Sequence, residues 1–419
     1  MEERKITVFI YLPGETVAVP AGIFTHHGDS GIGAFAYGRR YVERHNALPV
    51  DPIALPLGVA PREVTGNGGL YGAFRDAAPD YWGRLVIAAG AGAPPEALSE
   101  IDFLLAGNAS RIGNLDFRSS PGNHEPNLGP SHFNDLAQII QAARKLTAGE
   151  TVESRLLKLL RQGSSMGGAR PKCTVEWQDA LWIAKFSARE DTLNIPRIEF
   201  ATMELALRCG ITVPEHKLVS VGENDIFLSC RFDRERSRSR WLKRGFLSAL
   251  SLMQWDEGDR HLWDYTAIAD VMRRHMKATD IQELYRRMLF NILVRNTDDH
   301  PRNHGFLVDD GKMSLSPAYD IVPTPTLFGV GTGFLLAMSV GERGRDATLE
   351  NALSRSARYG LSKEQARTIV QQLLQTVSGW REHFEECGVS RRQVESLAPS
   401  FAICDGAGAS PFSSVGPPP

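Results

Sequence analysis

The chain has few cysteines and no long apolar run, and each absence excludes a class of protein. Its five cysteines are scattered over 419 residues without the paired spacing that zinc ligands need. Their odd number and wide separation are typical of a reducing cytoplasm rather than of a disulfide-rich secreted domain. No apolar run approaches membrane-spanning length, and the first residues predict a strand rather than a signal peptide. These features predict a cytoplasmic protein without a membrane partner.

The chain also lacks a strong excess of charge of either sign. A net charge of -2 provides no bulk attraction to nucleic acid or to an anionic membrane. An apolar content of 42% and a charged content of 23% are those of a soluble globular protein. The length allows a sizeable core and predicts two or three structural units.

A helix, a polar loop and a hairpin follow one another between Ile281 and Asp320. Apolar residues first repeat at the spacing of one buried helix face. The polar run 296–303 comes next, and two short strands, 305–308 and 313–315, are then joined by a turn. A loop with Asp, four residues and Asn, followed by a hairpin and another Asp, has the order of a kinase catalytic loop and its metal-binding Asp.

Phosphoryl transfer explains the residue types in this loop. An acceptor hydroxyl needs a carboxylate that orients it and takes its proton, and metal ions on ATP phosphates need hard oxygen ligands. The spacing assigns Asp298 to the first role and Asn303 and Asp320 to the second. Asp299 lies one residue too close to Asn303. The alternative is an acidic turn after a helix, with Asn as a cap.

A glycine-containing run precedes another predicted hairpin. Residues 164–172 read Ser-Ser-Met-Gly-Gly-Ala-Arg-Pro-Lys and lead into strands at 173–177 and 181–186. Gly167 and Gly168, with hydroxyls and cations around them, can fold backbone N–H groups over a phosphate. The run matches neither the P-loop nor the protein-kinase glycine pattern, so a flexible turn is the alternative.

Lys185 interrupts an apolar strand, which costs stability unless the ammonium group is paired or reaches solvent. A helix is predicted from near Pro196, and it carries Glu199 and Glu204. Kinases use a helical Glu to fix the strand Lys that contacts the ATP phosphates. The alternative is an edge-strand Lys beside a solvated Glu.

The remaining segments predict a β-rich beginning and a helical end. Their patterns predict strands at 6–12, 17–19, 34–37 and 225–230, an edge segment at 54–57, and helices at 70–88, 133–146, 152–160, 241–276 and 361–384. Ser362 and Gln365 form a candidate capping box for the last helix. The polar cluster within 70–88 predicts a solvated or paired face; it comprises Arg75, Asp76, Asp80 and Arg84.

Short runs along nearly the whole chain carry a resemblance to a known family. They are residues 49–52, 55–57, 72–76, 79–84, 104–113, 165–172, 231–234, 297–303 and 318–320. In this order they resemble the HipA family of bacterial serine/threonine kinases, the toxins of HipBA-type toxin–antitoxin modules. The main departure is Asp299, which stands where the family usually has Gly and adds a carboxylate beside Asp298.

The resemblance implies a two-lobed α+β fold, protein-kinase-like (HipA/PI-kinase-like), with a β-rich N-terminal subdomain and an all-helical C-terminal lobe. It divides the chain into an N-terminal subdomain at 1–118, a linker at 119–132, a kinase N-lobe at 133–235, a C-lobe at 236–403 and a disordered tail at 404–419.

The resemblance also implies a role for each matching residue, with ATP and Mg²⁺ as cofactors. Asp298 would be the catalytic carboxylate, and Asn303 and Asp320 would hold Mg²⁺. Lys185 would contact the ATP phosphates with Glu199 as its partner, and Cys230 to Phe232 would line the adenine through backbone atoms. The other residues implied to contact the nucleotide are Ser165, Gly167, Gly168, Lys172 and His300. Ser165 would be autophosphorylated, with Ser164 as a second candidate.

The implied function is a serine/threonine protein kinase that autophosphorylation of the loop serine silences. The implied partner is a HipB-like helix-turn-helix antitoxin, through which alone the kinase would reach DNA. The substrate would be a protein such as an aminoacyl-tRNA synthetase or another translation factor. Two alternatives remain open: a catalytically weak scaffold or co-repressor for the antitoxin, and a small-molecule or lipid kinase.

Overall fold

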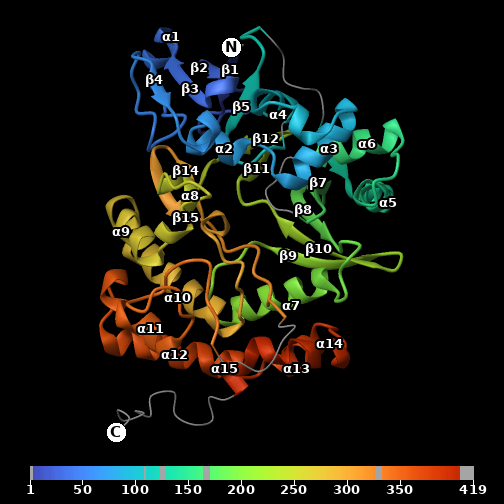
Figure 1. Ribbon diagram of the computed structural model, residues 1–419, viewed down its shortest axis with the longest axis vertical. Helices are drawn as coiled ribbons and strands as arrows, with labels where there is room; N and C mark the ends of the chain where they lie inside the picture. The colour runs from blue at the N-terminus through green and yellow to red at the C-terminus, as the bar shows by residue number, and fades with distance from the viewer. Residues whose placement is uncertain (1–2, 108–109, 123–128, 164–169, 326–332, 406–419) are drawn as a thin grey trace. The chain divides into compact units, whose positions relative to one another are not determined.

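The computed structural model describes residues 3–107, 110–122, 129–163, 170–325 and 333–405 (Figure 1). The chain forms two compact units, each assembled from segments that are separated in the sequence. The first unit comprises Met1–Thr192, Pro214–Asp259 and His304–Ser316, and the second comprises Leu193–Val213, Arg260–Asn303 and Pro317–Pro419. The fold is mixed α+β with a β-rich N-terminal region and a helical C-terminal part, as the sequence predicted. The predicted division into consecutive domains, with boundaries after residues 118, 132, 235 and 403, stays a prediction.

The N-terminal region of the first unit is built on an antiparallel five-stranded sheet in the order β4-β3-β2-β1-β5. Its strands are β1 (Glu3–Ile10), β2 (Val19–His27), β3 (Ile32–Tyr37), β4 (Arg62–Val64) and β5 (Leu115–Arg118), and the short helices α1 (Arg39–Val42), α2 (Gly72–Ala77) and α4 (Glu100–Ala106) accompany it. The predicted strands at 6–12 and 34–37 are confirmed, whereas the segment predicted at 17–19 belongs to a strand that begins at Val19.

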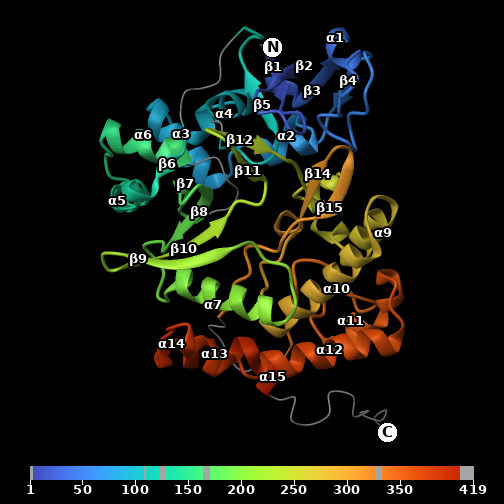
Figure 2. The ribbon, with the colours of Figure 1, turned by 180° about the vertical axis from the view of Figure 1, so that it is seen from behind.

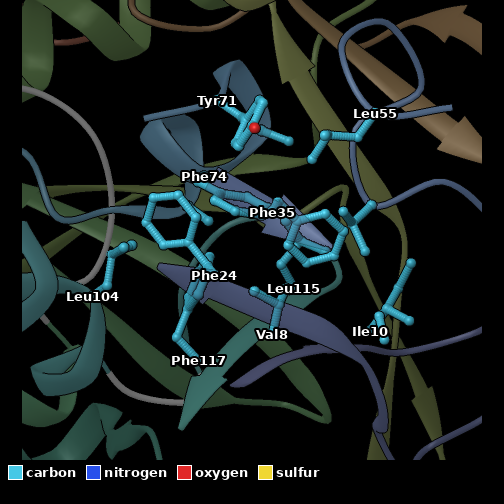
Figure 3. Packing of buried hydrophobic residues seen from close by; sticks show 14 of the residues in the cluster. Val8, Ile10, Phe24, Phe35, Leu55, Tyr71, Phe74, Leu104, Leu115 and Phe117 are labelled. Atoms are coloured by element: carbon cyan, nitrogen blue, oxygen red, sulfur yellow. The ribbon is translucent and has the colours of Figure 1, made fainter. Parts of the chain in front are cut away.

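Phe74 of α2 lies at the centre of the core on this sheet (Figure 3). Its ring makes edge-to-face contacts with Phe24, Phe35 and Phe117 at centroid distances of 5.2, 5.7 and 5.2 Å. Such pairs contribute roughly 0.5–1.5 kcal/mol each beyond the burial of their area. Phe74 therefore fixes α2, and with it the polar residues that follow in the same helix, against the sheet.

The predicted edge segment at 54–57 is not a strand; only an isolated bridge joins Asp51 and Leu55. The Asp51 carboxylate accepts hydrogen bonds from the N–H groups of Ile53 (3.0 Å) and Ala54 (2.9 Å). This side chain therefore bends the backbone into a turn where the apolar residues alone suggested an extended segment.

The helix predicted over 70–88 is two helices, α2 and α3 (Tyr81–Ala91), with Ala78 extended between them. Pro79 disfavours helical geometry at the preceding residue, and the Asp80 carboxylate caps the second helix through the Gly83 N–H. The rest of the polar cluster is paired. Arg84 binds Glu100 at 2.7 Å, and Asp76 accepts hydrogen bonds from the Ser248 N–H and hydroxyl.

A second five-stranded sheet of the first unit has the order β6-β7-β8-β10-β9. Its strands are β6 (Ser131–His132), β7 (Lys172–Trp177), β8 (Ala180–Phe186), β9 (His216–Val221) and β10 (Asn224–Cys230). The predicted turn at 178–179 is confirmed: Gln178 and Asp179 both have positive φ (49° and 57°), as a two-residue hairpin turn of type I′ requires. One face, which includes Cys173, Trp182 and Leu228, packs with α3, α5 (Leu136–Thr147) and α6 (Ser154–Gly163) (Figure 2).

The helix predicted from residue 241 is wrong in its first part. The chain instead forms the hairpin β11 (Arg234–Ser237) and β12 (Arg240–Lys243), then β13 (Gly245–Ser248) and α8 (Ala249–Leu252). β13 pairs with β14 (Gly305–Asp309), which pairs with β15 (Lys312–Leu315), as expected for the hairpin at 305–315. The partner of β13 lies far along the chain, so local periodicity could not reveal this strand.

The second unit is helical. Its α-helices are α7 (Ile195–Arg208), α9 (Tyr265–His275), α10 (Ala278–Leu293), α11 (Leu349–Ser354), α12 (Lys363–Val377), α13 (Trp380–Glu386), α14 (Arg391–Leu397) and α15 (Ala402–Asp405). The capping box of α12 is confirmed, because Ser362 and Gln365 exchange side chain-to-backbone hydrogen bonds of 2.8 and 3.1 Å. Across the ranges that the structure describes, no helix combines the length and apolarity needed to cross a membrane.

Candidate active site

The predicted catalytic loop begins where α10 ends. Arg295 adopts a left-handed conformation (φ 52°), and the Asn296 N–H reaches back to the Asn291 carbonyl at 2.9 Å. A left-handed residue with a backward hydrogen bond is a common way to stop a helix. The Asn296 side chain also donates to Asn291 Oδ1 at 3.1 Å, so the start of the loop is anchored to the helix.

Hydrogen bonds within the loop set its shape. The His300 N–H donates to the Asp298 carbonyl and the Asn303 N–H donates to the His300 carbonyl, both at 2.8 Å. Asn303 Nδ2 donates to the Asp298 carbonyl at 3.1 Å, and the Asn303 residue is only 8% exposed. Because the amide nitrogen is used inside the loop, Asn303 Oδ1 is the amide atom suited to binding a cation.

The segment that carries Asp320 is tied to this loop. The Tyr319 hydroxyl donates to the Arg302 carbonyl at 2.8 Å. Thr324 Oγ1 lies 3.2 Å from Thr297 N and 2.9 Å from Thr297 Oγ1. The second unit therefore brings Asp298, Asn303 and Asp320 onto two segments that hydrogen bonds hold side by side.

Asp320 has a left-handed backbone, with φ 61°. A non-glycine residue in this region costs of order 1–3 kcal/mol and persists where its surroundings fix it, often in functional sites. Asp adopts this conformation more readily than most residues. No local pattern in the sequence indicated this conformation, since Asp320 was nominated only by its position in the order of the motif.

The two adjacent carboxylates of the loop differ in their exposure to solvent. Asp298 is exposed, whereas Asp299 is only 2% exposed. Asp298 is therefore the carboxylate that a substrate from solution can reach. His300 Nδ1 is a buried ring nitrogen that finds no hydrogen-bond partner within the described part of the chain.

Two lysines of the first unit face one another across β7 and β8. Lys172 and Lys185 are Cα partners in the antiparallel register, so their side chains leave the same face of the sheet. This is the face opposite to Cys173 and Trp182, which pack with the helices. Lys185 Nζ lies 5.9 Å from the centre of the Phe227 ring, and Lys172 is 4% exposed. Directly opposed like charges are destabilising unless negative charge lies near them.

The structure does not describe several of the other residues that were predicted to contact the nucleotide. Ser164, Ser165, Gly167 and Gly168 lie outside the described residues. Glu199 is buried in α7 of the second unit and Lys185 belongs to the first, so their pairing stays a prediction.

The predicted adenine-lining segment uses part of its backbone inside the first unit. The Cys230 N–H donates to the Glu215 carbonyl at 2.7 Å, and the Arg231 N–H donates to the Leu181 carbonyl at 2.8 Å. A nucleotide base at Cys230 to Phe232 would therefore have to bind other backbone groups of this segment.

The charged residues that follow form a buried ion-pair network that the sequence interpretation missed. Asp233 accepts hydrogen bonds from Arg231 Nη2 and Arg234 Nη1, both at 2.7 Å, and from the Gly113 N–H at 2.9 Å. Burial alone would raise the pKa of Asp233, but the two guanidinium groups outweigh it and lower this pKa to about 2. Both arginines also donate to the Arg111 carbonyl. The motif therefore anchors residues 231–234 to the loop at 110–113.

The predicted magnesium ligands form a small set. Among the described residues, no group of three or more His, Cys, Asp or Glu side chains is placed to hold a metal ion. Mg²⁺ needs fewer protein ligands, because one or two carboxylates usually hold it together with substrate phosphates and water. Asn303 and Asp320 carry amide and carboxylate oxygens, which are the types of ligand that Mg²⁺ binds.

Comparisons with known proteins agree with these motifs. Residues 164–380 match the model of the HipA-like C-terminal domain. "Putative kinase Y4dM" of Sinorhizobium fredii is 29% identical over 227 residues, which cover 50% of this chain and 54% of that protein. "Putative kinase Y4mE" of the same organism is 26% identical over 350 residues, covering 77% and 79%. The chain thus spans only about half the length of the first of these relatives.

A solved structure shares the fold over nearly the whole chain. HipA of Shewanella oneidensis MR-1, in a complex with HipB and its operator DNA, has a TM-score of 0.67 and 16% sequence identity, covering 95% of this chain and 96% of that one. The identity is too low to transfer function, and the likeness establishes the fold. Because the domain model spans more than half of the sequence, the chain belongs to the family of proteins with a HipA-like C-terminal domain.

Proposed function

We propose that this chain is an ATP- and Mg²⁺-dependent serine/threonine protein kinase, the toxin of a type II toxin–antitoxin system. The observation that carries the proposal is the bracing of the loop 298–303 against the segment of Asp320 by Tyr319 and Thr324. This bracing keeps the segments of Asp298, Asn303 and Asp320 side by side, and it supports the proposal because phosphoryl transfer requires a carboxylate and hard oxygen ligands of these types.

In the proposed reaction, the Asp298 carboxylate orients the acceptor hydroxyl and takes its proton. Asn303 Oδ1 and the Asp320 carboxylate would hold Mg²⁺, which when bound offsets the negative charge of the phosphates. Lys172 and Lys185 supply positive charge for the phosphate chain from their shared face of the sheet. Because hydrogen bonds fix the loop in advance, little reorganisation is needed during the reaction.

The proposed partners follow from the family. The complex of the Shewanella protein with HipB and operator DNA supports a helix-turn-helix antitoxin as partner, with DNA bound through it. The proposed substrate is a serine or threonine of a protein that acts in translation, such as an aminoacyl-tRNA synthetase. Autophosphorylation of Ser165 or Ser164 would silence the kinase.

Intact-mass spectrometry tests the proposal directly. The full-length chain, first treated with phosphatase, is incubated with ATP and Mg²⁺, and proteolytic mapping locates any phosphate. We expect a gain of phosphate that maps to Ser165 or Ser164. If ATP binds but no phosphate appears on the chain, on added protein or on a lipid panel, the scaffold alternative explains the family membership better.

Lys185→Gln is expected to weaken ATP binding by about tenfold or more, since hydrogen bonds to charged groups are lost. Lys217→Gln is the matched control. Lys217 lies on β9 of the same sheet but points to the opposite face, 4.8 Å from the centre of the Trp182 ring. Titration of a fluorescent ATP analogue measures both dissociation constants. Equal weakening by the two substitutions would mean that ATP does not use the face of Lys185.

A further inference from the structure

Arg295 stands just after α10, at a position of the helix end that glycine commonly occupies. Its backbone is left-handed (φ 52°), and its N–H donates to the Ile292 carbonyl at 3.2 Å. Glycine is the usual residue in this conformation after a helix, because a Cβ atom is disfavoured there. Non-glycine residues with such a backbone are concentrated at functional sites. Ending the helix therefore does not explain why the residue is arginine.

The guanidinium group of Arg295 lies over an aromatic ring that the backbone holds in place. Arg295 Cζ is 4.7 Å from the centre of the Phe334 ring. The Phe334 carbonyl accepts a hydrogen bond from the Ala347 N–H (3.0 Å), and an isolated bridge joins the next residue, Leu335, to Asp346. Stacking on a ring restricts a guanidinium group while its N–H groups, which lie in its plane, can still donate. Phe334 therefore presents the donors of Arg295 with little freedom.

No carboxylate pairs with this guanidinium group within the ranges that the structure describes. Asp298, three residues further on, is exposed and forms no ion pair with it. Burial lowers the pKa of Arg295, a direction that a nearby carboxylate would oppose. Arg295 is only half-buried, so a group from solution can reach it. A guanidinium group is weakly hydrated and its planar fork matches two oxygens, so a carboxylate is the side-chain group that it binds best.

Arg295 is close to the carboxylate that is proposed to orient the acceptor hydroxyl. The three residues from Arg295 to Asp298 span at most about 11 Å. The Arg295 carbonyl also accepts a hydrogen bond from the Thr324 N–H at 3.0 Å, so Arg295 belongs to the same two braced segments of the second unit. An extended substrate with its serine at Asp298 would cover this distance in about three residues. An acidic residue a few positions from that serine could therefore meet Arg295.

We propose that Arg295 is a specificity-determining residue that binds a carboxylate of the protein substrate. The carboxylate would belong to an Asp or Glu within about five residues of the phosphorylated serine or threonine. This inference rests on the proposed kinase function and adds that the substrate sequence is acidic. The ion pair would form equally in the bound substrate and in the transition state, so its effect is expected in KM rather than in kcat.

Phosphorylation of synthetic peptides tests this inference. Each peptide has a central serine in an otherwise uncharged sequence, with Glu or Gln at one position up to about five residues away. The full-length chain, first treated with phosphatase, is incubated with ATP, Mg²⁺ and each peptide, and mass spectrometry gives the initial rates. We expect Glu at one or more positions to lower KM by about fivefold relative to Gln, the upper range for an accessible ion pair. This preference should shrink as the salt concentration is raised.

Arg295→Gly and Arg238→Gly are matched variants. Arg238 is an exposed arginine with the same left-handed backbone (φ 56°) in the turn between β11 and β12. Glycine suits this conformation, so both variants should fold, which circular dichroism verifies. We expect Arg295→Gly to abolish the preference for Glu over Gln and Arg238→Gly to retain it. Arg295→Lys keeps the charge without the planar fork, so it should retain only part of the preference.

Three results would overturn the role of Arg295. Glu and Gln peptides might react equally in the wild type, or the preference might survive Arg295→Gly, or this variant might slow both kinds of peptide alike, as expected of a residue that only shapes the loop. A chain that gains phosphate itself but modifies no peptide would also contradict the inference, since an acidic sequence would then not be sufficient for recognition. Absence of phosphate from both chain and peptides would instead refute the kinase proposal, and this inference with it.

Discussion

Replacing Asp298 with Asn is expected to slow phosphate incorporation by about a hundredfold to ten-thousandfold, the usual contribution of a general base. Asn keeps the size of the side chain but cannot take the proton of the acceptor hydroxyl. The backbone of the loop should be unchanged, since the hydrogen bonds that shape it use the Asp298 carbonyl and not its carboxylate. The initial rate, measured by intact mass with ATP and Mg²⁺, gives the effect.

Asp310→Asn is the matched control for this substitution. Asp310 is exposed in the turn between β14 and β15, where its positive φ (47°) suits Asn as well as Asp. We expect it to incorporate phosphate at the wild-type rate. If Asp298→Asn were as active as the control, the carboxylate would have no role in proton transfer, and the proposed mechanism would be wrong.

Local signals predicted those parts of the fold that local interactions determine. The capping box of α12 and the turn at Gln178 and Asp179 depend on a few adjacent residues. The buried face of α10 depends on a repeat within one helix. Each could therefore be predicted from its own short stretch of sequence.

The incorrect predictions of secondary structure have a different cause. The strand β13 exists because it pairs with β14, about 60 residues further along the chain, and nothing near residue 245 indicates that pairing. The segment at 54–57 bends because of the side chain of Asp51, a residue outside the apolar run. Secondary structure that depends on tertiary contacts of this kind overrides local propensity.

The order of the site residues along the chain could be predicted from the sequence, whereas the geometry of the site could not. The spacing of Asp298, Asn303 and Asp320 was sufficient to nominate them. Their spacing could not show that Tyr319 and Thr324 brace the two segments, because these contacts form only when the chain folds. Burial, which the sequence does not report, distinguishes exposed Asp298 from buried Asp299.

The buried network at Asp233 supports the second large prediction: Asp233→Asn should lower the free energy of unfolding by about 3–5 kcal/mol. The side chains of Arg231 and Arg234 are 0% and 1% exposed, so both would keep a charge in the interior after their common carboxylate is removed. The Asn amide would also direct N–H groups toward donors. Urea denaturation monitored by fluorescence measures the change. Asp179→Asn, in the exposed turn between β7 and β8, should stay within about 0.5 kcal/mol of the wild type.

The pH dependence of the unfolding free energy, measured for the wild type and for Asp233→Asn, distinguishes loss of charge from a simple packing defect. The pKa of Asp233 is lowered from 3.8 to about 2, so the folded state binds the proton more weakly than the unfolded chain. The contribution of this carboxylate to stability is therefore complete above about pH 4 and is lost as the pH falls through about 2. Asp233→Asn has no such group, so the difference in unfolding free energy between wild type and variant should shrink over this interval. A difference that stays constant from pH 5 to 2 would mean that Asn disturbs packing, and that the ion pairs of Asp233 contribute little to the anchoring of residues 231–234.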